Sequence, residues 1–118
     1  MKLIIAGSRA HVPRQRDTEI ITRVVEELGV TEIVHGAQTG ADTMGENYAR
    51  AMGIRYSGFP GNWKKYGHKV CYLMRNSAMA AYCEPSDACL LFPGGDGTAD
   101  MRRKAKARGM TVIEAYEK

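Results

Sequence analysis

The stretch that most constrains the fold is residues 86–100, SDACLLFPGGDGTAD. The apolar run at 88–92 predicts a short buried strand, and the residues after the glycines are typical of a helix start. Gly94, Gly95 and Gly97 allow positive φ angles and carry no Cβ atom that would keep a ligand from the backbone. The free N–H groups and positive dipole end of a helix start bind anions such as phosphate. This stretch therefore predicts a strand, a phosphate-binding loop and a helix, whereas a plain tight turn would not require three glycines.

The rest of the chain repeats the same alternation of strand and helix. Apolar runs predict four further strands, at 2–6, 31–34, 54–59 and 111–115. Apolar residues at helical spacing predict helices between the strands, and the third of these, over about 69–83, is apolar on most sides. The sequence therefore predicts an α/β protein: a single Rossmann-like domain over 1–118, with an open parallel sheet of about five strands and helices on both faces.

Composition limits the possible functions. The chain has 118 residues, of which 17 are Lys or Arg and 13 are Asp or Glu, so its net charge is +4. This mild excess favours anionic ligands without singling out nucleic acid. The three cysteines and three histidines do not follow metal-binding spacings, so neither a metal site nor a cofactor is expected. The first apolar run is too short for a signal peptide or a membrane span, and we expect a cytoplasmic protein.

The informative loops all follow strands. These loops are Gly7-Ser8-Arg9 and the segments 35–42, 60–63 and 93–98. In an open parallel sheet the loops after the strands share one edge, where ligands bind. The standard nucleotide motifs are missing: no GxGxxG follows the first strand, no Walker GK[ST] is present, and there is no GxSxG. The pattern predicts one ligand site of a different kind.

These loops also carry a family resemblance, which extends from Gly7 to about Met101. The segments that carry it are Gly7-Ser8-Arg9, HGAQTGAD at 35–42, FP and Trp63 at 59–63, Arg75-Asn76, and FPGGDGT at 92–98. Together they resemble the YspA/YpsA-related branch of the SLOG superfamily, to which the lonely-guy phosphoribohydrolases and the Rossmann-like domain of DNA-processing protein A also belong. The resemblance implies binding of a nucleotide or a nucleotide-derived phosphate ligand. It also implies a sensing or sequestering role, because several relatives, phage-encoded ones among them, sense such ligands.

The lonely-guy enzymes suggest an alternative function. They release the base from a nucleoside 5′-monophosphate, with an arginine and a PGGxGTxxE glutamate at the glycosidic bond. Arg75 lies where that arginine would be, but Met101 occupies the glutamate position, and a thioether cannot accept a proton. Whether any activity is retained stays open, and the candidate catalytic residues are Arg75, Asp100 and Asp42, with Asp96 as a further acid.

The predicted ligand-binding residues come from all of these loops. They are Gly7, Ser8, Arg9, Gly36, Gly40, Asp42, Arg75, Asn76, Gly94, Gly95, Gly97 and Thr98. Several have structural alternatives: Thr98 can bind phosphate or cap its helix, and Asp42 can bind a ribose hydroxyl or cap the second helix. Arg75 must be paired with a ligand or an aspartate, and Arg9 can clamp a phosphate or lie on the rim.

Three further features concern possible partners. Trp63 can stack on a base or anchor an interface, and His35 is interpreted as a loop histidine with a structural hydrogen bond. The basic run after the glycine loop suggests single-stranded nucleic acid as a second alternative, but a solvated helix surface is favoured because no aromatic residues are interleaved with it. Apolar residues of the third helix suggest a homodimer; they are Val70, Leu73, Met74, Ala78, Ala80 and Ala81.

Overall fold

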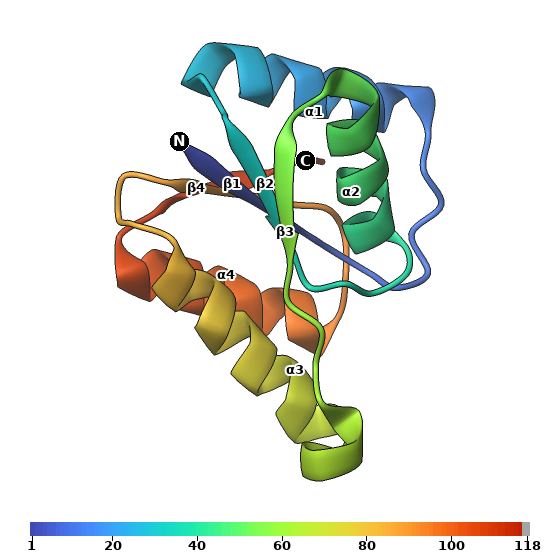
Figure 1. Cartoon of the computed structure of the whole chain (residues 1–118), viewed down its shortest axis with the longest axis vertical. Helices are drawn as coiled ribbons and strands as arrows, with labels where there is room; N and C mark the ends of the chain where they lie inside the picture. Colours follow the sequence, from blue (N-terminus) through green and yellow to red (C-terminus); the bar gives the residue numbers. More distant parts are fainter. Residues whose placement is uncertain (117–118) are drawn as a thin grey trace.

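The computed structural model describes residues 1–116 and, within them, every side chain except those of Trp63, His68 and Lys69. Strands and helices alternate along the described chain, as Figure 1 shows. The strands are β1 Lys2–Ala6, β2 Glu32–His35, β3 Arg55–Gly58, β4 Ala88–Leu91 and β5 Thr111–Glu114. The helices are α1 Gln15–Leu28, α2 Ala41–Met52, α3 Trp63–Tyr82 and α4 Asp96–Arg108.

The strands form one parallel sheet in the order β3-β2-β1-β4-β5. Helices α1 and α2 cover one face, and α3 and α4 cover the other (Figure 1). Right-handed crossovers between parallel strands produce this three-layer arrangement. The predicted fold class is therefore confirmed.

Both faces of the central strand are buried, which explains its continuous apolar sequence. Leu3 and Ile5 pack against α1 and α2, whereas Ile4 and Ala6 pack against α3 and α4. Because side chains alternate along a strand, an apolar residue is needed at each position when helices lie on both sides. The core is thus divided by the sheet into two apolar layers.

Two predicted boundaries are wrong. Helix α4 begins at Asp96, so Gly97 and Thr98 belong to its first turn and not to the loop before it. Helix α3 begins at Trp63 and not near 69, with a break at Gly67, whose φ angle is 76°. Left-handed φ angles are readily adopted only by glycine, so this residue joins a short first turn to the main part of α3.

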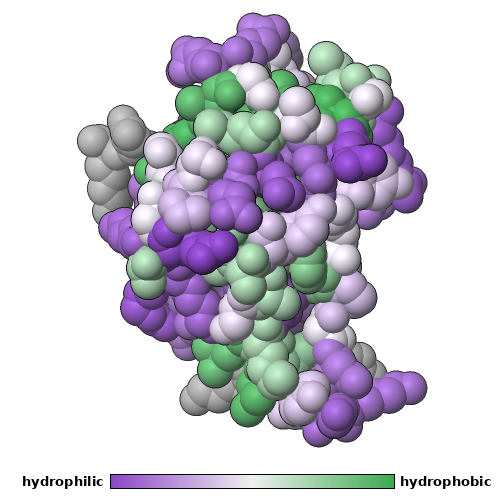
Figure 2. Space-filling view, turned by 60° about the vertical axis from the view of Figure 1, so that its left-hand side comes forward, coloured by the Kyte–Doolittle hydropathy of each residue, from purple (hydrophilic) through white to green (hydrophobic). Residues whose placement is uncertain are grey.

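The apolar helix α3 is only partly buried within the chain. Met79 and Ala80 pack in the core, but Val70 is 47% exposed and Met74 is 44% exposed. The first part of α3 stands away from the sheet in Figure 1, and Figure 2 shows a notch in the molecular outline above it. This projection leaves a hollow beside the ends of the strands.

The chain reverses its direction of travel across the sheet after β3. Strands β2 and β3 lie on one side of β1, whereas β4 and β5 lie on the other. The loops after β1 and β4 therefore diverge, and a crevice opens at the carboxyl edge between them. Close to the ends of the two strands, the Ser8 N–H donates to the Pro93 carbonyl oxygen at 2.9 Å and links the two loops there.

Candidate functional site

A cleft of about 920 Å³ lies at the carboxyl edge of the sheet. Its walls come from the loop after β1, the loop between β2 and α2 with the first turn of α2, Pro60 and Gly61 after β3, the main part of α3 and the start of α4. Nine of the twelve predicted ligand-binding residues line it, from four of these segments: Gly7, Ser8, Arg9, Asp42, Arg75, Asn76, Gly95, Gly97 and Thr98. The four segments are far apart in sequence, and the parallel topology brings them together.

The start of α4 presents free backbone donors to this cleft. Gly95 is its N-cap, and the N–H groups of Asp96, Gly97 and Thr98 make no hydrogen bond within the described chain. Asn76 of α3 donates from Nδ2 to the Gly97 carbonyl oxygen at 3.0 Å, which fixes the first turn of α4 against α3. Unpaired N–H groups at a helix start, held rigidly at a cleft, are suited to bind an anion.

Arg75 brings a positive charge to the same cleft. Its Nε and Nη1 atoms are buried and have no hydrogen-bond partner among the described residues. The guanidinium lies against Gly36, where a Cβ atom would be only 2.6 Å from Nε. Since buried charged donors are normally paired, this arginine lacks the partner that its position requires.

Asp42 is the acidic group of the cleft and is only 6% exposed. Burial raises the pKa of Asp42 to about 6, although the nearby Arg75 guanidinium and the backbone N–H groups of Gln38 and Gly36 oppose this rise. The Gln38 N–H donates to Oδ2 at 3.3 Å. Asp42 does not cap α2, because Gly40 is the N-cap residue. Its carboxyl group can therefore exchange a proton near neutral pH.

Three of the predicted ligand-binding glycines do not line the cleft: Gly36, Gly40 and Gly94. Gly36 makes room for Arg75. Gly40 has a φ angle of 73°, and a Cβ atom there would lie 2.2 Å from the Ser8 carbonyl oxygen. At Gly94 a Cβ atom would lie 2.0 Å from Thr98 Oγ1. These glycines allow the close packing of the loops around the cleft.

Other predicted contacts are already partly engaged within the protein. Ser8 Oγ accepts a hydrogen bond from the Ala10 N–H at 3.0 Å, and Asn76 Nδ2 donates to Asp100 as well as to Gly97. Thr98 is buried and makes no capping bond, and Arg9 is exposed at the rim. Asn76 thus supports the site from behind, whereas Arg9 and Ser8 remain at its entrance.

Asp100 does not line the cleft. Its carboxylate pairs with Lys104 at 2.8 Å and with Arg103 at 3.3 Å, and it accepts a bond from Asn76 at 3.1 Å. Burial alone would raise the pKa of Asp100, but the bonds from Lys104 and Asn76 hold it below its usual value. Met101, a residue of α4, is fully buried in the core, so the position of the lonely-guy glutamate faces the core and not the cleft. Of the proposed acids, Asp42 and the exposed Asp96 remain beside the cleft.

The basic run on α4 is largely paired with the protein itself. Arg102 forms a two-bond pair with Glu114 at 2.8 and 2.9 Å. Arg103 and Lys104 pair with Asp100, and Arg108 donates to the Cys83 carbonyl oxygen. These contacts anchor α4 to α3 and β5, as expected for a helix surface with structural ion pairs.

Several residues that line the cleft are not among those predicted from the sequence. Tyr72 places its ring beside Gly97 on the α3 wall, and Gln38, Thr39 and Cys71 also line the cleft. Cys71 and Tyr72 lie one helical turn before Arg75, and they could be placed beside it only once the bounds of α3 were known. The side chain of Trp63, which was considered for base stacking, is outside the described residues.

The described part of the chain holds no cluster of three or more His, Cys, Asp or Glu residues that could bind a metal ion. Across the same residues, no helix combines the length and the apolar character that a membrane crossing requires.

Comparison with known proteins identifies the family. A family model for the YspA, cpYpsA-related SLOG family matches residues 1–66, which include the loop after β1 and the HGAQTGAD loop. The chain belongs to this family. No curated protein and no solved structure matches the sequence. SLOG membership indicates binding of a small, nucleotide-related ligand in general terms, and the matched half contributes Ser8, Arg9 and Asp42 to the cleft.

The buried Asp42 leads to a prediction about stability. Its folded pKa of about 6 lies above the usual value of 3.8, so stability is lost as the pH rises through this interval and the buried carboxyl group ionises. We expect Asp42→Asn to raise the free energy of unfolding at pH 7 by about 2 to 3 kcal/mol. At pH 4 the variant and the original protein should be nearly equal, and urea unfolding at both pH values measures the difference.

The matched control for this measurement is Asp96→Asn, which removes a charge from the exposed edge of the same cleft. Its effect should stay below about 1 kcal/mol at either pH. An Asp42→Asn effect that is the same at both pH values would contradict the raised pKa.

Proposed function

We propose that this SLOG-family chain binds a nucleotide or a nucleotide-derived phosphate in the cleft at the carboxyl edge of its sheet. The observation that carries the proposal is that two sets of unpaired donors meet there: the buried Nε and Nη1 of Arg75 and the N–H groups at the start of α4. A phosphate group would satisfy both. The volume of about 920 Å³ leaves room for a sugar and a base beside the phosphate.

Sensing or sequestration is favoured over catalysis in this proposal. The acid that the lonely-guy reaction uses has no counterpart in the cleft, because Met101 is buried in the core. The start of α2 offers Asp42, whose oxygens are suited to hydroxyl groups of a ribose. The proposed roles are therefore phosphate binding by Gly95, Gly97, Thr98 and Arg75, and sugar binding by Asp42.

A thermal-shift panel of mono-, di-, cyclic and ADP-ribose-type nucleotides tests this proposal. A ligand at a hundred times its dissociation constant should stabilise the protein by about 2.7 kcal/mol, which raises Tm by several degrees. Arg75→Ala should abolish the shift while the protein stays folded, because Nε and Nη1 make no hydrogen bond among the described residues that the variant would lose. The matched control Arg23→Ala removes the same charge from the exposed side of α1 and should keep the shift.

A second variant tests the backbone donors directly. A Cβ atom at Gly95 would meet no protein atom within 4 Å, so Gly95→Ala should keep the Tm of the free protein and weaken binding at least about tenfold by occupying the cleft. Gly94→Ala is unsuitable, since its Cβ atom would clash with Thr98. Equal shifts in the Arg75→Ala and Arg23→Ala proteins would mean that the ligand binds elsewhere, and no shift with any nucleotide would refute the proposal.

A second candidate function is hydrolysis of the N-glycosidic bond of a nucleoside 5′-monophosphate. The observation that favours it is the buried Asp42, whose pKa of about 6 suits a general base and which lies near Arg75. Water would add to the C1′ atom while the bond to the base breaks. Asp42 would take one proton from this water, and the departing base would gain one proton on its nitrogen, so that the water is divided between the sugar and the base.

Overnight incubation with AMP, GMP, CMP and UMP, followed by chromatography for free base, tests this activity. Free base should appear with the original protein and fall by at least about a hundredfold with Asp42→Asn. Glu19→Gln, on the exposed side of α1 and away from the cleft, is the matched control and should retain the activity. If no base is released, the second candidate is wrong, and the binding proposal is unaffected.

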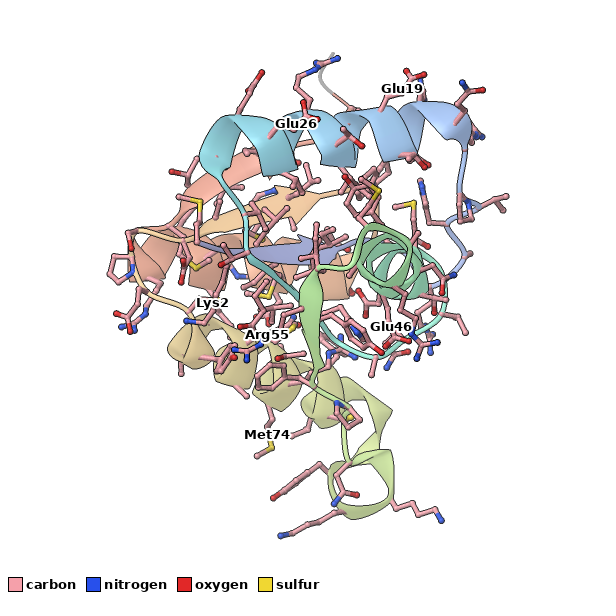
Figure 3. All side chains as sticks on the ribbon, turned by 45° about the horizontal axis from the view of Figure 1, so that its top comes forward. Lys2, Glu19, Glu26, Glu46, Arg55 and Met74 are labelled. Carbon is pink, nitrogen blue, oxygen red and sulfur yellow. The ribbon has the colours of Figure 1, made fainter. Side chains whose placement is uncertain are left out.

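We also propose that the chain forms a homodimer through α3. Val70, Met74, Ala78 and Ala81 are exposed on one face of the helix, and Figure 3 shows Met74 pointing away from the sheet. The cleft-lining residues Tyr72, Asn76 and Met79 lie on the opposite face, so a partner would not block the site. By contrast, Leu73 is half-buried and Ala80 is buried within the chain, so they contribute less to this exposed face.

Light scattering with size-exclusion chromatography should give twice the mass of one chain. Met74→Glu should reduce the mass to that of one chain, because a charge in an apolar interface is costly. Thr18→Glu, on the exposed side of α1, is the control and should leave the mass unchanged. A single-chain mass for the original protein at about 100 μM would contradict the dimer.

A further inference from the structure

Ala37 has an unusual backbone conformation. Its φ angle is 58°, and among the described residues it is the one residue other than glycine with a positive φ. This left-handed conformation is unfavourable for a residue with a Cβ atom, so surrounding contacts must hold it. Ala37 lies in the loop between β2 and α2, which forms one wall of the cleft.

His35 supplies the contact that holds Ala37. The Ala37 N–H donates to Nδ1 of the His35 ring at 3.0 Å. Since Nδ1 accepts this bond, the neutral ring carries its proton on Nε2. Nε2 lies 3.0 Å from Oε1 of Glu46 without the alignment of a hydrogen bond. Figure 3 shows Glu46 reaching from α2 toward this loop.

The His35 ring is locked by its surroundings. Its side chain is 3% exposed, and the ring stacks on Tyr56 of β3 with centroids 6.3 Å apart. Gly58 makes this position possible, because a Cβ atom there would lie 2.9 Å from Cε1 of the ring. Burial lowers the pKa of His35, although Glu46 opposes this shift, so the ring stays neutral at physiological pH.

The turn that His35 holds also carries the contacts of both charged groups in the cleft. The N–H groups of Gly36 and Gln38, on either side of Ala37, stabilise the Asp42 carboxylate. Gly36 also provides the space in which the Arg75 guanidinium lies. A change in the conformation of Ala37 would therefore rotate the Gln38 N–H away from Asp42 and disturb the turn in which Gly36 makes room for Arg75.

We propose that His35 is a positioning residue of the binding cleft, whose Nδ1 acceptor holds the turn at residues 36–38 in the shape that orients Asp42 and Arg75. This inference deepens the proposed function and rests on it for its biological meaning. The structural part can be tested without any ligand. It attributes the role to one acceptor atom and not to the size of the ring.

The test compares His35→Asn with His35→Leu. Both variants lose the ring and its packing against Tyr56 and Gly58, so both should lower Tm by a similar amount. The Oδ1 atom of asparagine can take the place of Nδ1 as the acceptor for Ala37, whereas leucine has no acceptor. A difference between the two variants therefore reports the hydrogen bond alone.

The readout is the titration of the Asp42 carboxyl group, followed by carbon NMR in the ligand-free protein. The original protein should titrate near 6, and His35→Asn should stay close to this value. In His35→Leu the lost N–H bonds should raise the titration midpoint by about one pH unit. Arg75 of α3 faces Asp42 in all three proteins, and Glu46 and Tyr56, which face position 35, are also unchanged.

Equal midpoints in the two variants would overturn the proposal. If His35→Leu does not fold, a long-range proton–nitrogen correlation on the original protein decides instead: a proton on Nε2 supports the proposal, and a proton on Nδ1 refutes it. Calorimetry with AMP as the probe adds the functional arm, in which His35→Leu should bind at least about tenfold more weakly than His35→Asn. Absence of AMP binding in all proteins would count against AMP as the ligand, while the Asp42 titration would still decide the role of His35.

Discussion

The parallel pairing of β1 with both β2 and β4 is the constraint on which the rest of the structure depends. Because the chain turns in opposite directions on the two sides of β1, the loops after β1 and β4 separate and leave a crevice. The bond from the Ser8 N–H to the Pro93 carbonyl oxygen then fixes the distance between these loops. The starts of α2 and α4 are brought to the same edge, so two helix N-termini and Arg75 surround one cavity.

The electrostatics of this cavity are unusual for a protein interior. Arg75 has buried N–H groups without partners, and Asp42 is buried with a pKa raised to about 6. Elsewhere the protein satisfies its buried acids well. Asp17, for example, accepts bonds from His11, Tyr116 and the Arg14 backbone, and despite its burial its pKa is lowered. Unsatisfied charge concentrated at one cleft is what a site prepared for a polar ligand requires, since stability is sacrificed there.

The glycines illustrate how a small family motif can have several separate functions. In HGAQTGAD, Gly36 makes room for Arg75, whereas Gly40 allows the close approach of the Ser8 carbonyl oxygen. In PGGDGT, Gly94 makes room for Thr98, whereas Gly95 borders open space in the cleft. The same residue type therefore shapes the packing at three of these positions and leaves access for a ligand at the fourth. The lonely-guy pattern is kept at Arg75 but lost at Met101, which the fold uses for its core.

The sequence by itself determined the fold class, the order of the elements and the edge of the sheet at which the cleft lies. This was possible because apolar runs and apolar residues at helical spacing are local signals, and the loops after parallel strands must share one edge. Only the tertiary structure decided which residues face the cleft, because that depends on helix rotation and on packing between distant segments. It turned Met101 and Asp100 away, engaged Asn76 with α4 and brought Tyr72 to the wall. It also identified the Ala37 N–H as the partner of His35, for which the sequence indicated only a structural hydrogen bond.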